Sequence, residues 1–483
     1  MSSEQEDRRP DVAPQVVGIS LAAALGGFLF GFDTSVINGA IDAMSADFGI
    51  SGFLQGFAVS SALLGCVVGA WFSGTLAARW GRVRVMLLAA ILFFVSAVGS
   101  GFAVGTADLI AWRVLGGLAV GAASVIAPAY IAEVAPTSVR GRLASLQQLA
   151  IVLGIFAALL SDAALAGAAG GAAETLWAGR EAWRWMFWAE ALPAVGYGLF
   201  ALTIPESPRF LVDKGRIKEA TRVLRDYTRV RDTARKVEEI RRSLARESAE
   251  SLRDLLGRTF GLKPIVWVGI ALAVFQQFGG INVIFYYSTT LWRSVGFAEE
   301  EALTTSVITS VINVAVTVLS ILLVDKIGRR PLLLVGSGGM AVTLATVAVA
   351  FSQAQAGDGG TSLPDPWGLI ALVGANGFVV FFGATWGPVM WVMLGEMFPN
   401  RIRATAVAVA TAFNWVANFT VSTTFPVLSE IGLSFAYGLY AACAAISFFL
   451  VHRFVSETKG RELEDMTDET GRPSRRRAAS ATG

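Results

Sequence analysis

The chain has 483 residues, of which 54% are hydrophobic and only 16% are charged, and its formal net charge is +2. Soluble domains carry roughly a quarter charged residues, so this composition excludes an ordinary soluble protein and indicates a membrane protein. The two cysteines, Cys66 and Cys443, and the single His452 exclude a disulfide framework, a thiolate metal site and histidine-based catalysis. We therefore expect no cofactor, no enzyme activity and no nucleic-acid partner.

Apolar runs in chain order predict twelve transmembrane helices. A helix needs about 20 apolar residues to cross roughly 30 Å of hydrocarbon. On that criterion the spans lie near 15–40, 53–77, 84–104, 107–129, 143–165, 184–204, 263–290, 303–325, 331–352, 367–394, 404–426 and 432–454. We predict an all-α polytopic membrane protein in which two six-helix halves, 15–205 and 263–455, form the transport unit.

The basic residues predict which side of the membrane the loops occupy. With both termini in the cytoplasm, only Arg113, Arg180, Arg184 and Arg293 of the 39 Lys and Arg residues lie outside predicted cytoplasmic segments. Cytoplasmic loops of membrane proteins carry an excess of Lys and Arg. We therefore predict a multi-pass protein of the cell membrane with both termini in the cytoplasm.

The polar segments outside the spans are predicted to be cytoplasmic. Residues 1–14 lack a signal-peptide cleavage pattern and form an N-terminal tail, and residues 456–483 form a C-terminal tail. The linker 206–262 has Ile, Val and Leu at helical spacing, with opposite charges three and four residues apart. It is expected to form two to four short amphipathic helices, and the alternative is a flexible charged linker.

Charged motifs repeat in the two halves at matching positions after the predicted spans. Glu133 and Arg140 match Glu396 and Arg403, Arg82 matches Arg329 in a Gly-Arg pair, and Glu206 matches Glu457 at the end of each half. A carboxylate in such a cluster can pair with a guanidinium group and with the positive N-terminal end of a helix. We predict that these residues gate the cytoplasmic side, while each one taken alone is also typical of a charge that only fixes topology.

The chain resembles the sugar porter family of the major facilitator superfamily over nearly its whole length. The resemblance rests on PAYIAEVAPTSVRG from Pro128, PESPRFL from Pro205, QQFGGINVIFYY from Gln276, DKIGRR from Asp325, GPVMWVMLGEMFPNRIR from Gly387 and ETKG from Glu457. It implies a carrier that works by alternating access, with its substrate site near the bilayer midplane. Ala78 and Ser456 depart from the family pattern, which normally has an acidic residue and a proline there.

Two ionisable residues stand out inside predicted spans. Asp33 lies in a Gly-rich stretch of the first span, which is expected to be broken by its glycines, and Arg113 lies in the fourth span. Charges within the membrane are costly and mark functional sites by default. The family resemblance implies that an acid at Asp33 accompanies proton coupling, so we predict Asp33 as the proton carrier and Arg113 as its partner. A static pair that ties two spans together is the alternative.

Polar and aromatic side chains of the spans form a predicted sugar site. A sugar requires several amide hydrogen bonds and an aromatic face. The candidates, which match the family's sugar-binding positions, are Phe30, Gln148, Gln276, Gln277, Asn282, Asn313, Trp391 and Asn414. For a single amide, hydrogen bonding between helices is an equally good interpretation. Trp386 and Trp415 match less directly and are alternatively packing residues.

The resemblance favours glucose as the substrate, because Ile155 and Phe285 are apolar and Asn414 is the shorter amide at its position. A carrier of the same fold for another neutral polyhydroxy substrate (xylose, galactose or inositol), a facilitator, and a non-transporting sugar sensor are the alternatives. The predicted partners are a small neutral sugar, a proton and the lipid bilayer, and the protein is expected to be a monomer. By the offset that aligns Glu133 with Glu396, Arg113 aligns with Asn376, so only the first half carries the buried charge.

Overall fold

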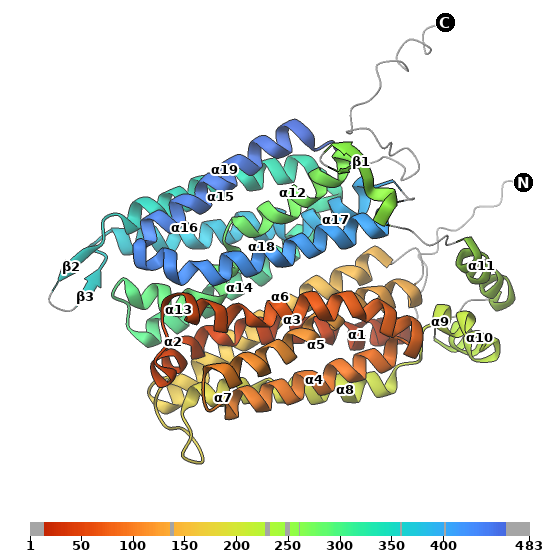
Figure 1. Cartoon of the computed structure of the whole chain (residues 1–483), viewed down its shortest axis with the longest axis horizontal. Helices are drawn as coiled ribbons and strands as arrows, with labels where there is room; N and C mark the ends of the chain where they lie inside the picture. Colours follow the sequence, from red (N-terminus) through yellow and green to blue (C-terminus); the bar gives the residue numbers. More distant parts are fainter. Residues whose placement is uncertain are drawn as a thin grey trace, which may run out of the picture. The chain divides into compact units, whose positions relative to one another are not determined.

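The computed structural model describes residues 14–135, 140–227, 232–246, 252–259, 261–357, 360–399 and 402–459 (Figure 1). Its long helices are α1 (Pro14–Ser35), α2 (Ile37–Phe48), α3 (Gly52–Trp80), α4 (Arg82–Phe102), α5 (Thr106–Val134), α6 (Arg140–Ala169), α7 (Ala182–Ala189), α8 (Ala191–Thr203), α12 (Pro264–Phe278), α13 (Ile281–Ser294), α14 (Glu299–Ile327), α15 (Arg329–Phe351), α16 (Trp367–Phe381), α17 (Gly387–Met397), α18 (Arg403–Ile431) and α19 (Leu433–Phe454). The predicted helical class is confirmed. The predicted tails lie mostly outside the described residues.

The membrane-spanning helices coincide with the predicted spans. In the described part of the chain, ten helical stretches are long and apolar enough to cross a membrane. The two other predicted spans are also helical: the sixth consists of α7 and α8, which meet at Glu190, and the eleventh is α18. Every span predicted from the sequence therefore corresponds to one helix or to two or three consecutive helical elements.

The first span differs from its prediction in where it is interrupted. Helix α1 runs without a break through Gly26, Gly27 and Gly31, and the helical run is interrupted only at Val36, between α1 and α2. The glycines instead allow α6 to lie close, since a Cβ on Gly31 would come within 1.9 Å of the Ile151 carbonyl oxygen. The prediction of a helix broken by its glycines was wrong, because here these residues serve contact between helices.

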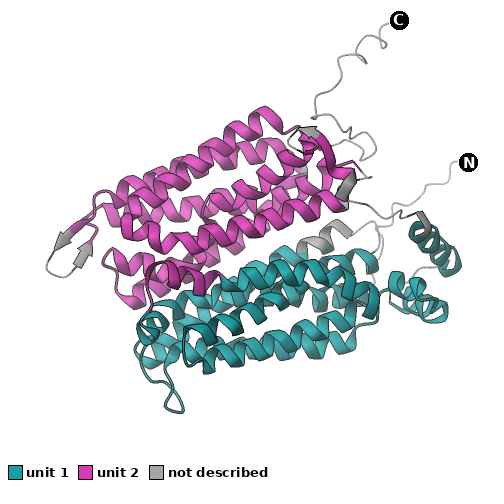
Figure 2. Cartoon of the chain, viewed as in Figure 1, with its two compact units in different colours: residues 1–49, 61–248 teal, residues 50–60, 249–483 magenta. Residues whose placement is uncertain are grey.

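The chain divides into two compact units, shown in different colours in Figure 2. Unit 1 comprises residues 1–49 and 61–248, and unit 2 comprises residues 50–60 and 249–483. In unit 1, α1 packs along α6 and α4 packs along α5; in unit 2, α15 packs along α16 and α19, and α12 packs along α18. The division into halves at 15–205 and 263–455 remains a prediction from the sequence.

Helices α3 and α5 of unit 1 approach each other through glycines. A Cβ on Gly117 would lie 1.8 Å from the Ala62 carbonyl oxygen, and one on Gly121 would lie 2.2 Å from that of Cys66. Gly65 of α3 is equally close to the backbone of α5. Small residues four apart let helix backbones pack closely in a membrane, where lipid tails are as apolar as the side chains.

The linker forms short helices, as predicted. They are α9 (Pro208–Asp213), α10 (Ile217–Asp226), α11 (Thr233–Arg246) and the 3-10 turn η1 (Leu252–Leu255), followed by the short strand β1 (Leu256–Thr259). Their apolar faces share a small core in which Leu211, Leu224 and Val237 are buried. A short antiparallel hairpin, β2 (Gln355–Gly357) and β3 (Gly360–Ser362), follows α15. This hairpin was not predicted from the sequence.

The contact between α3 and α5 predicts a sharp difference between two glycine substitutions. Gly117→Ala places a methyl group against the Ala62 carbonyl and is expected to destabilise unit 1 by about 1–3 kcal/mol, the usual cost of overpacking. The matched control is Gly74→Ala on α3, because a Cβ there meets nothing within 4 Å. Thermal unfolding of the purified protein in detergent is the measurement. Equal melting temperatures for the two variants would contradict the packing described.

Candidate functional site

An ion pair between Asp33 and Arg113 is buried inside unit 1. Arg113, on α5, is 2% exposed, and Asp33, near the end of α1, is fully buried. The Arg113 Nη1 donates to the Asp33 Oδ1 and to the Asp33 backbone carbonyl, both at 3.0 Å. The guanidinium carbon lies 5.9 Å from the centre of the Phe187 ring. The two residues that the sequence singled out are thus in direct contact, held by two hydrogen bonds.

Gly116, on the next turn of α5, leaves room for this ion pair because it has no side chain. A Cβ on Gly116 would lie 3.0 Å from the Asp33 Oδ1 and 2.5 Å from the Ser96 Oγ. The Ser96 hydroxyl donates to the Trp112 carbonyl on α5, which joins α4 to the same turn. Three helices, α1, α4 and α5, therefore fix the position of the carboxylate.

A second carboxylate, Glu190, belongs to the same cluster and was missed in the sequence analysis. It is 1% exposed and lies at the junction of α7 and α8. Its side chain lies near enough to Asp33 and Arg113 to interact electrostatically with both. Glu190 falls within the predicted sixth span, so the rule that intramembrane charges are functional candidates was sufficient to identify it.

The cluster contains two carboxylates and one guanidinium group. With both carboxylates ionised the group carries one uncompensated negative charge, and one bound proton makes it neutral. Two adjacent carboxylates also require a proton for a hydrogen bond between them, because an ionised carboxylate only accepts. Uncompensated buried charge costs several kcal/mol. The arrangement is therefore suited to binding and releasing a single proton.

In unit 2, four of the predicted sugar-binding amides are joined by hydrogen bonds. The Asn282 Nδ2 donates to the Gln277 Oε1 at 2.6 Å, and the Gln277 Nε2 donates to the oxygens of Gln276 and Asn414, both at 3.2 Å. The Asn414 Nδ2 donates to the Gln276 Oε1 and to the Ala273 carbonyl, both at 2.8 Å. Helices α12, α13 and α18 thus contribute to one amide cluster, which consists of Gln276, Gln277, Asn282 and Asn414.

The amide cluster lies where α12 ends and α13 begins. The break occurs at Gly279 and Gly280. Gly280 has φ of 79°, a left-handed conformation that favours glycine, and a Cβ there would lie 2.7 Å from the Tyr440 ring. The break places Gln277 and Asn282 on consecutive short helices, close enough for their side chains to bond.

Gln276 also contacts the irregular part of the tenth span. The segment η2 (Phe382–Trp386) between α16 and α17 is a π-helix, a form often found at functional sites. The Gln276 Nε2 donates to the backbone carbonyls of Trp386 at 3.1 Å and Gly387 at 3.3 Å. The Trp386 indole donates to the Leu333 carbonyl and the Ser337 hydroxyl, both at 3.0 Å, so Trp386 is a packing residue.

The other predicted sugar-binding residues come from α14 and α17 of unit 2 and from α1 and α6 of unit 1. Asn313, on α14, is buried, and its Oδ1 would lie 3.2 Å from a Cβ on Gly383 of η2. Trp391, on α17, is 38% exposed. Phe30 and Gln148 are half-buried residues of α1 and α6 in unit 1. In the described part of unit 2, no hydrogen bond joins Asn313 or Trp391 to the amide cluster.

A charge cluster at the start of α4 joins three of the repeated motifs in unit 1. The Arg82 Nη2 donates to the Glu133 Oε1 at 2.8 Å. Glu206 accepts hydrogen bonds from the backbone N–H groups of Arg82 and Val83, the first of α4. Gly81, with φ of 98°, precedes them in a conformation that favours glycine, and the Ser207 hydroxyl completes the cluster by donating to Glu133.

Unit 2 repeats this arrangement at the start of α15. The Arg329 side chain donates to both oxygens of Glu396, at 3.0 and 2.8 Å. Glu457 accepts from the N–H groups of Arg329 and Arg330, both at 3.0 Å, and Gly328 has φ of 104°. The Thr458 hydroxyl donates to Glu396, in the role of Ser207. The predicted pairing of carboxylates with guanidinium groups and helix N-termini is present in both units.

The last two gating candidates, Arg140 and Arg403, are not part of these two charge clusters as described. Arg403 donates from Nε and Nη2 to the Phe398 carbonyl and so closes the turn before α18. Arg140 begins α6, but its side chain lies outside the described residues. The gating role of all eight residues remains a prediction.

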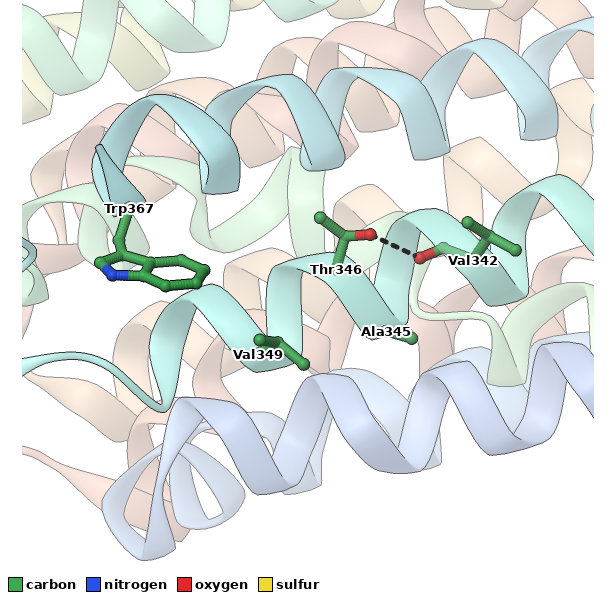
Figure 3. Close-up of a pocket in the computed structure, with 5 residues that line it drawn as sticks. All are labelled: Val342, Ala345, Thr346, Val349 and Trp367. Atoms are coloured by element: carbon green, nitrogen blue, oxygen red, sulfur yellow. Dashed lines mark hydrogen bonds between the residues drawn. The ribbon is translucent and has the colours of Figure 1, made fainter. Parts of the chain in front are cut away.

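The groove in Figure 3, about 390 Å³ in volume, lies on α15 and the start of α16. It is lined by Val342, Ala345, Thr346, Val349 and Trp367. The hydroxyl of Thr346 is already bonded to the Val342 carbonyl, and Val342 and Val349 are more than half exposed. This lining is apolar and suits contact with lipid tails rather than with a sugar.

Comparisons with known proteins agree with the fold. A family model described as "Sugar (and other) transporter" matches residues 19–469. A glucose transport protein of Synechocystis sp. is 54% identical over 93% of this chain and 97% of its own. A D-xylose-proton symporter of Escherichia coli is 36% identical over 93% and 95%. The solved inward-open xylose transporter XylE from E. coli superimposes with a TM-score of 0.79 at 34% identity, covering 93% of this chain and 99% of that one.

The Glu457 cluster predicts a pH dependence of stability. Partial burial acts to raise the pKa of Glu457, but backbone N–H donors outweigh it and hold the pKa of this carboxyl below its usual value of 4.5. A group with a depressed pKa stabilises the fold above its unfolded pKa and loses that contribution as the pH falls through the folded value. Wild type should therefore lose stability below about pH 4.5, and Glu457→Gln should remove this part of the acid dependence.

Thermal unfolding between about pH 7 and pH 4 measures the effect. At neutral pH, Glu457→Gln should cost about 1–3 kcal/mol, the range for hydrogen bonds to a charged acceptor. Glu219→Gln is the control, because Glu219 forms only an exposed ion pair with Arg216, and it should change nothing measurable. Identical acid dependence of Glu457→Gln and wild type would rule out the role given to Glu457.

Proposed function

The chain belongs to the sugar transporter family of the major facilitator superfamily, and from this premise we propose that it is a proton-coupled sugar symporter with glucose as its substrate. The observation that carries the proposal is the buried cluster of Asp33, Arg113 and Glu190. A facilitator has no need of a buried group that binds one proton. In a symporter that group links sugar movement to the proton gradient.

Asp33 is the proton carrier of this proposal, and Arg113 is the partner that adjusts its proton affinity. The ion pair has one carboxylate oxygen bonded to Arg113, and the second oxygen, Oδ2, has no hydrogen-bond partner among the described residues. Protonation of the carboxyl weakens its attraction to Arg113 and frees α1 and α5 to move relative to each other. Glu190 is placed to share the proton, which extends the predicted pair to three residues.

The driving force is sufficient for uphill transport. One proton moved through about 100 mV supplies about 2.3 kcal/mol, and one pH unit adds about 1.4 kcal/mol. Their sum permits a sugar gradient of roughly 500-fold at one proton per sugar. A facilitator, in contrast, only equalises the sugar concentrations on the two sides of the membrane.

The amide cluster is the proposed sugar site. Neutral amides donate and accept hydrogen bonds, as sugar hydroxyls do, and none of the four carries a charge that would select an ionic substrate. The remaining members of the proposed site are Phe30, Gln148, Asn313 and Trp391. The name of the Synechocystis relative favours glucose, and the names of the E. coli relatives make xylose the second candidate.

Alternating access requires that the cytoplasmic side open and close. We assign this gating to the paired clusters around Arg82 and Arg329, with Glu133, Glu206, Glu396 and Glu457 as their acceptors. Arg140 and Arg403 complete the proposed set. The protein functions as a monomer in the cell membrane with both termini in the cytoplasm, the orientation that the distribution of basic residues favours.

Asp33→Asn tests proton coupling. The amide keeps the shape of the side chain but cannot ionise, so it cannot bind and release a proton. The variant should therefore fail to accumulate sugar against a gradient. Sugar exchange across the membrane at equal pH should continue. The measurement is uptake and counterflow of labelled glucose in proteoliposomes with and without an imposed pH gradient. Asp108→Asn, a partly exposed carboxylate that caps Val104 N–H, is the control. Full uphill uptake by Asp33→Asn would contradict the assignment.

Gln277→Ala tests the sugar site. Loss of one or two amide hydrogen bonds, at 0.5–1.5 kcal/mol each, should raise the KM for glucose about tenfold and change the maximal rate less. Gln353→Ala, an exposed glutamine after α15, should leave both values unchanged. Counterflow with glucose, xylose and inositol measures the effect and ranks the substrates. An unchanged KM in Gln277→Ala would remove the amide cluster from the site, and a preference for xylose would select the second candidate.

A further inference from the structure

A third buried carboxylate in unit 1, Asp162, is not used by the proposed mechanism. It lies on α6, within the predicted fifth span, and is fully buried. Neither Asp162 nor Glu190 was named as a candidate from the sequence. A charged residue type at such a depth is a functional candidate by default, and its partners decide what it can do.

Asp162 has a single hydrogen-bond donor. The backbone N–H of Gly39 donates to its Oδ2 at 3.2 Å. Its other oxygen, Oδ1, is buried and has no partner among the described residues. The contact is close, because a Cβ on Gly39 would lie 2.6 Å from the Asp162 Cβ. The carboxyl group is therefore held against α2 by one oxygen, and the other oxygen lacks a donor.

The Gly39 N–H belongs to the start of a helix inside the membrane. Helix α2 begins at Ile37, after the interruption at Val36, so Gly39 is its third residue. The first N–H groups of a helix lack partners within it and carry a partial positive charge. Asp162 caps this end from the neighbouring helix, which ties α6 to the junction of α1 and α2.

No charged side chain of the described residues neutralises Asp162. The helices packed against α6 carry Asp33 on α1; Asp42 and Asp47 on α2; Asp108, Arg113 and Glu133 on α5; and Arg184 on α7. Arg113 is bonded to Asp33, and Arg184 to Asp47. Among the described residues, the donor that contacts the Asp162 carboxylate is the backbone N–H of Gly39.

The balance of energies favours a bound proton on Asp162. An ionised carboxylate without a counter-charge is costly in a protein interior, and more costly in lipid. The helix N-terminus offsets only a small part of this cost. The neutral acid avoids the charge and leaves only one hydroxyl group unsatisfied, which costs less. A neutral carboxyl group is therefore the form that fits this site.

The position of Asp162 relates it to the Asp33 cluster. Gly39 follows Asp33 by six residues, which corresponds to about 9 Å along a helix axis. Asp162 thus lies beyond Asp33, on the side on which α2 continues toward Phe48. In a protein with cytoplasmic termini this is the side from which external protons arrive.

We propose that Asp162 is a second proton-binding site, which passes protons between the end of unit 1 at Phe48 and the cluster of Asp33, Arg113 and Glu190. In each transfer the Asp162 carboxyl gives its proton through water to the ionised carboxylate of the cluster, and the resulting Asp162 carboxylate takes a proton from the external solution. Proton binding by Asp162 is inferred from the structure of unit 1 alone, whereas proton transfer to the Asp33 cluster rests on the proposed symport.

Infrared spectroscopy tests the bound proton directly. A protonated carboxylic acid has a C=O stretching band that an ionised carboxylate and an amide lack. At neutral pH the wild-type spectrum should contain such a band, and Asp162→Asn should lose part of it, while Asp108→Asn should not. The Gly39→Ala variant keeps the carboxyl group but crowds it, and it should shift the same component. A spectrum of Asp162→Asn that superimposes on wild type would overturn the proposal.

Transport assays test the transfer. In proteoliposomes with an imposed pH gradient, Asp162→Asn should slow proton-driven glucose uptake about a hundredfold or more, the lower end of what a positioned proton donor contributes. Its glucose counterflow at equal pH should match wild type. Loss of the band together with unchanged uptake would refute the transfer. Absence of proton-driven uptake in wild type would instead refute the proposed symport, while the infrared result is read independently of it.

Discussion

The cost of burying charge in a membrane is the constraint on which the rest of this structure depends. Arg113 has no access to water, so its charge is stable only because Asp33 and Glu190 lie beside it. Three helical segments of unit 1 must converge at one point to supply these groups. Gly116 leaves room for the carboxylate, and the junction of α7 and α8 brings Glu190 into range. A site built under this constraint responds strongly to a single proton.

The two units share the charge clusters at the starts of α4 and α15, but they differ at the positions of Arg113 and Asn376. At the starts of α4 and α15, Arg82 and Arg329 hold equivalent glutamates, and a glycine with positive φ precedes each. At the position equivalent to Arg113, Asn376 instead accepts a hydrogen bond from the Thr309 hydroxyl. A neutral pair takes the place of the buried charges there, so the charge cluster around Asp33 belongs to unit 1 and the amide cluster belongs to unit 2.

The sequence predicted the spans, the Asp33–Arg113 pair and the amide cluster because each has a strong local signal. Long apolar runs, an isolated charge within one of them and a Gly-Gly break beside paired glutamines are visible without coordinates. The place of the break in the first span was predicted incorrectly, because glycine signals both flexibility and close packing. Glu190 and Asp162 show a further limit: the residue type marked them as candidates, but only the fold reveals which charges they face.

The central claim is that sugar entry carries protons through the cluster around Asp33. The most direct measurement follows the internal pH of proteoliposomes with a trapped fluorescent dye when glucose is added outside, without an imposed gradient. The account predicts acidification of the interior that is proportional to the glucose transported, with about one proton per sugar, and its disappearance in Asp33→Asn. Glucose entry at an unchanged internal pH would contradict it.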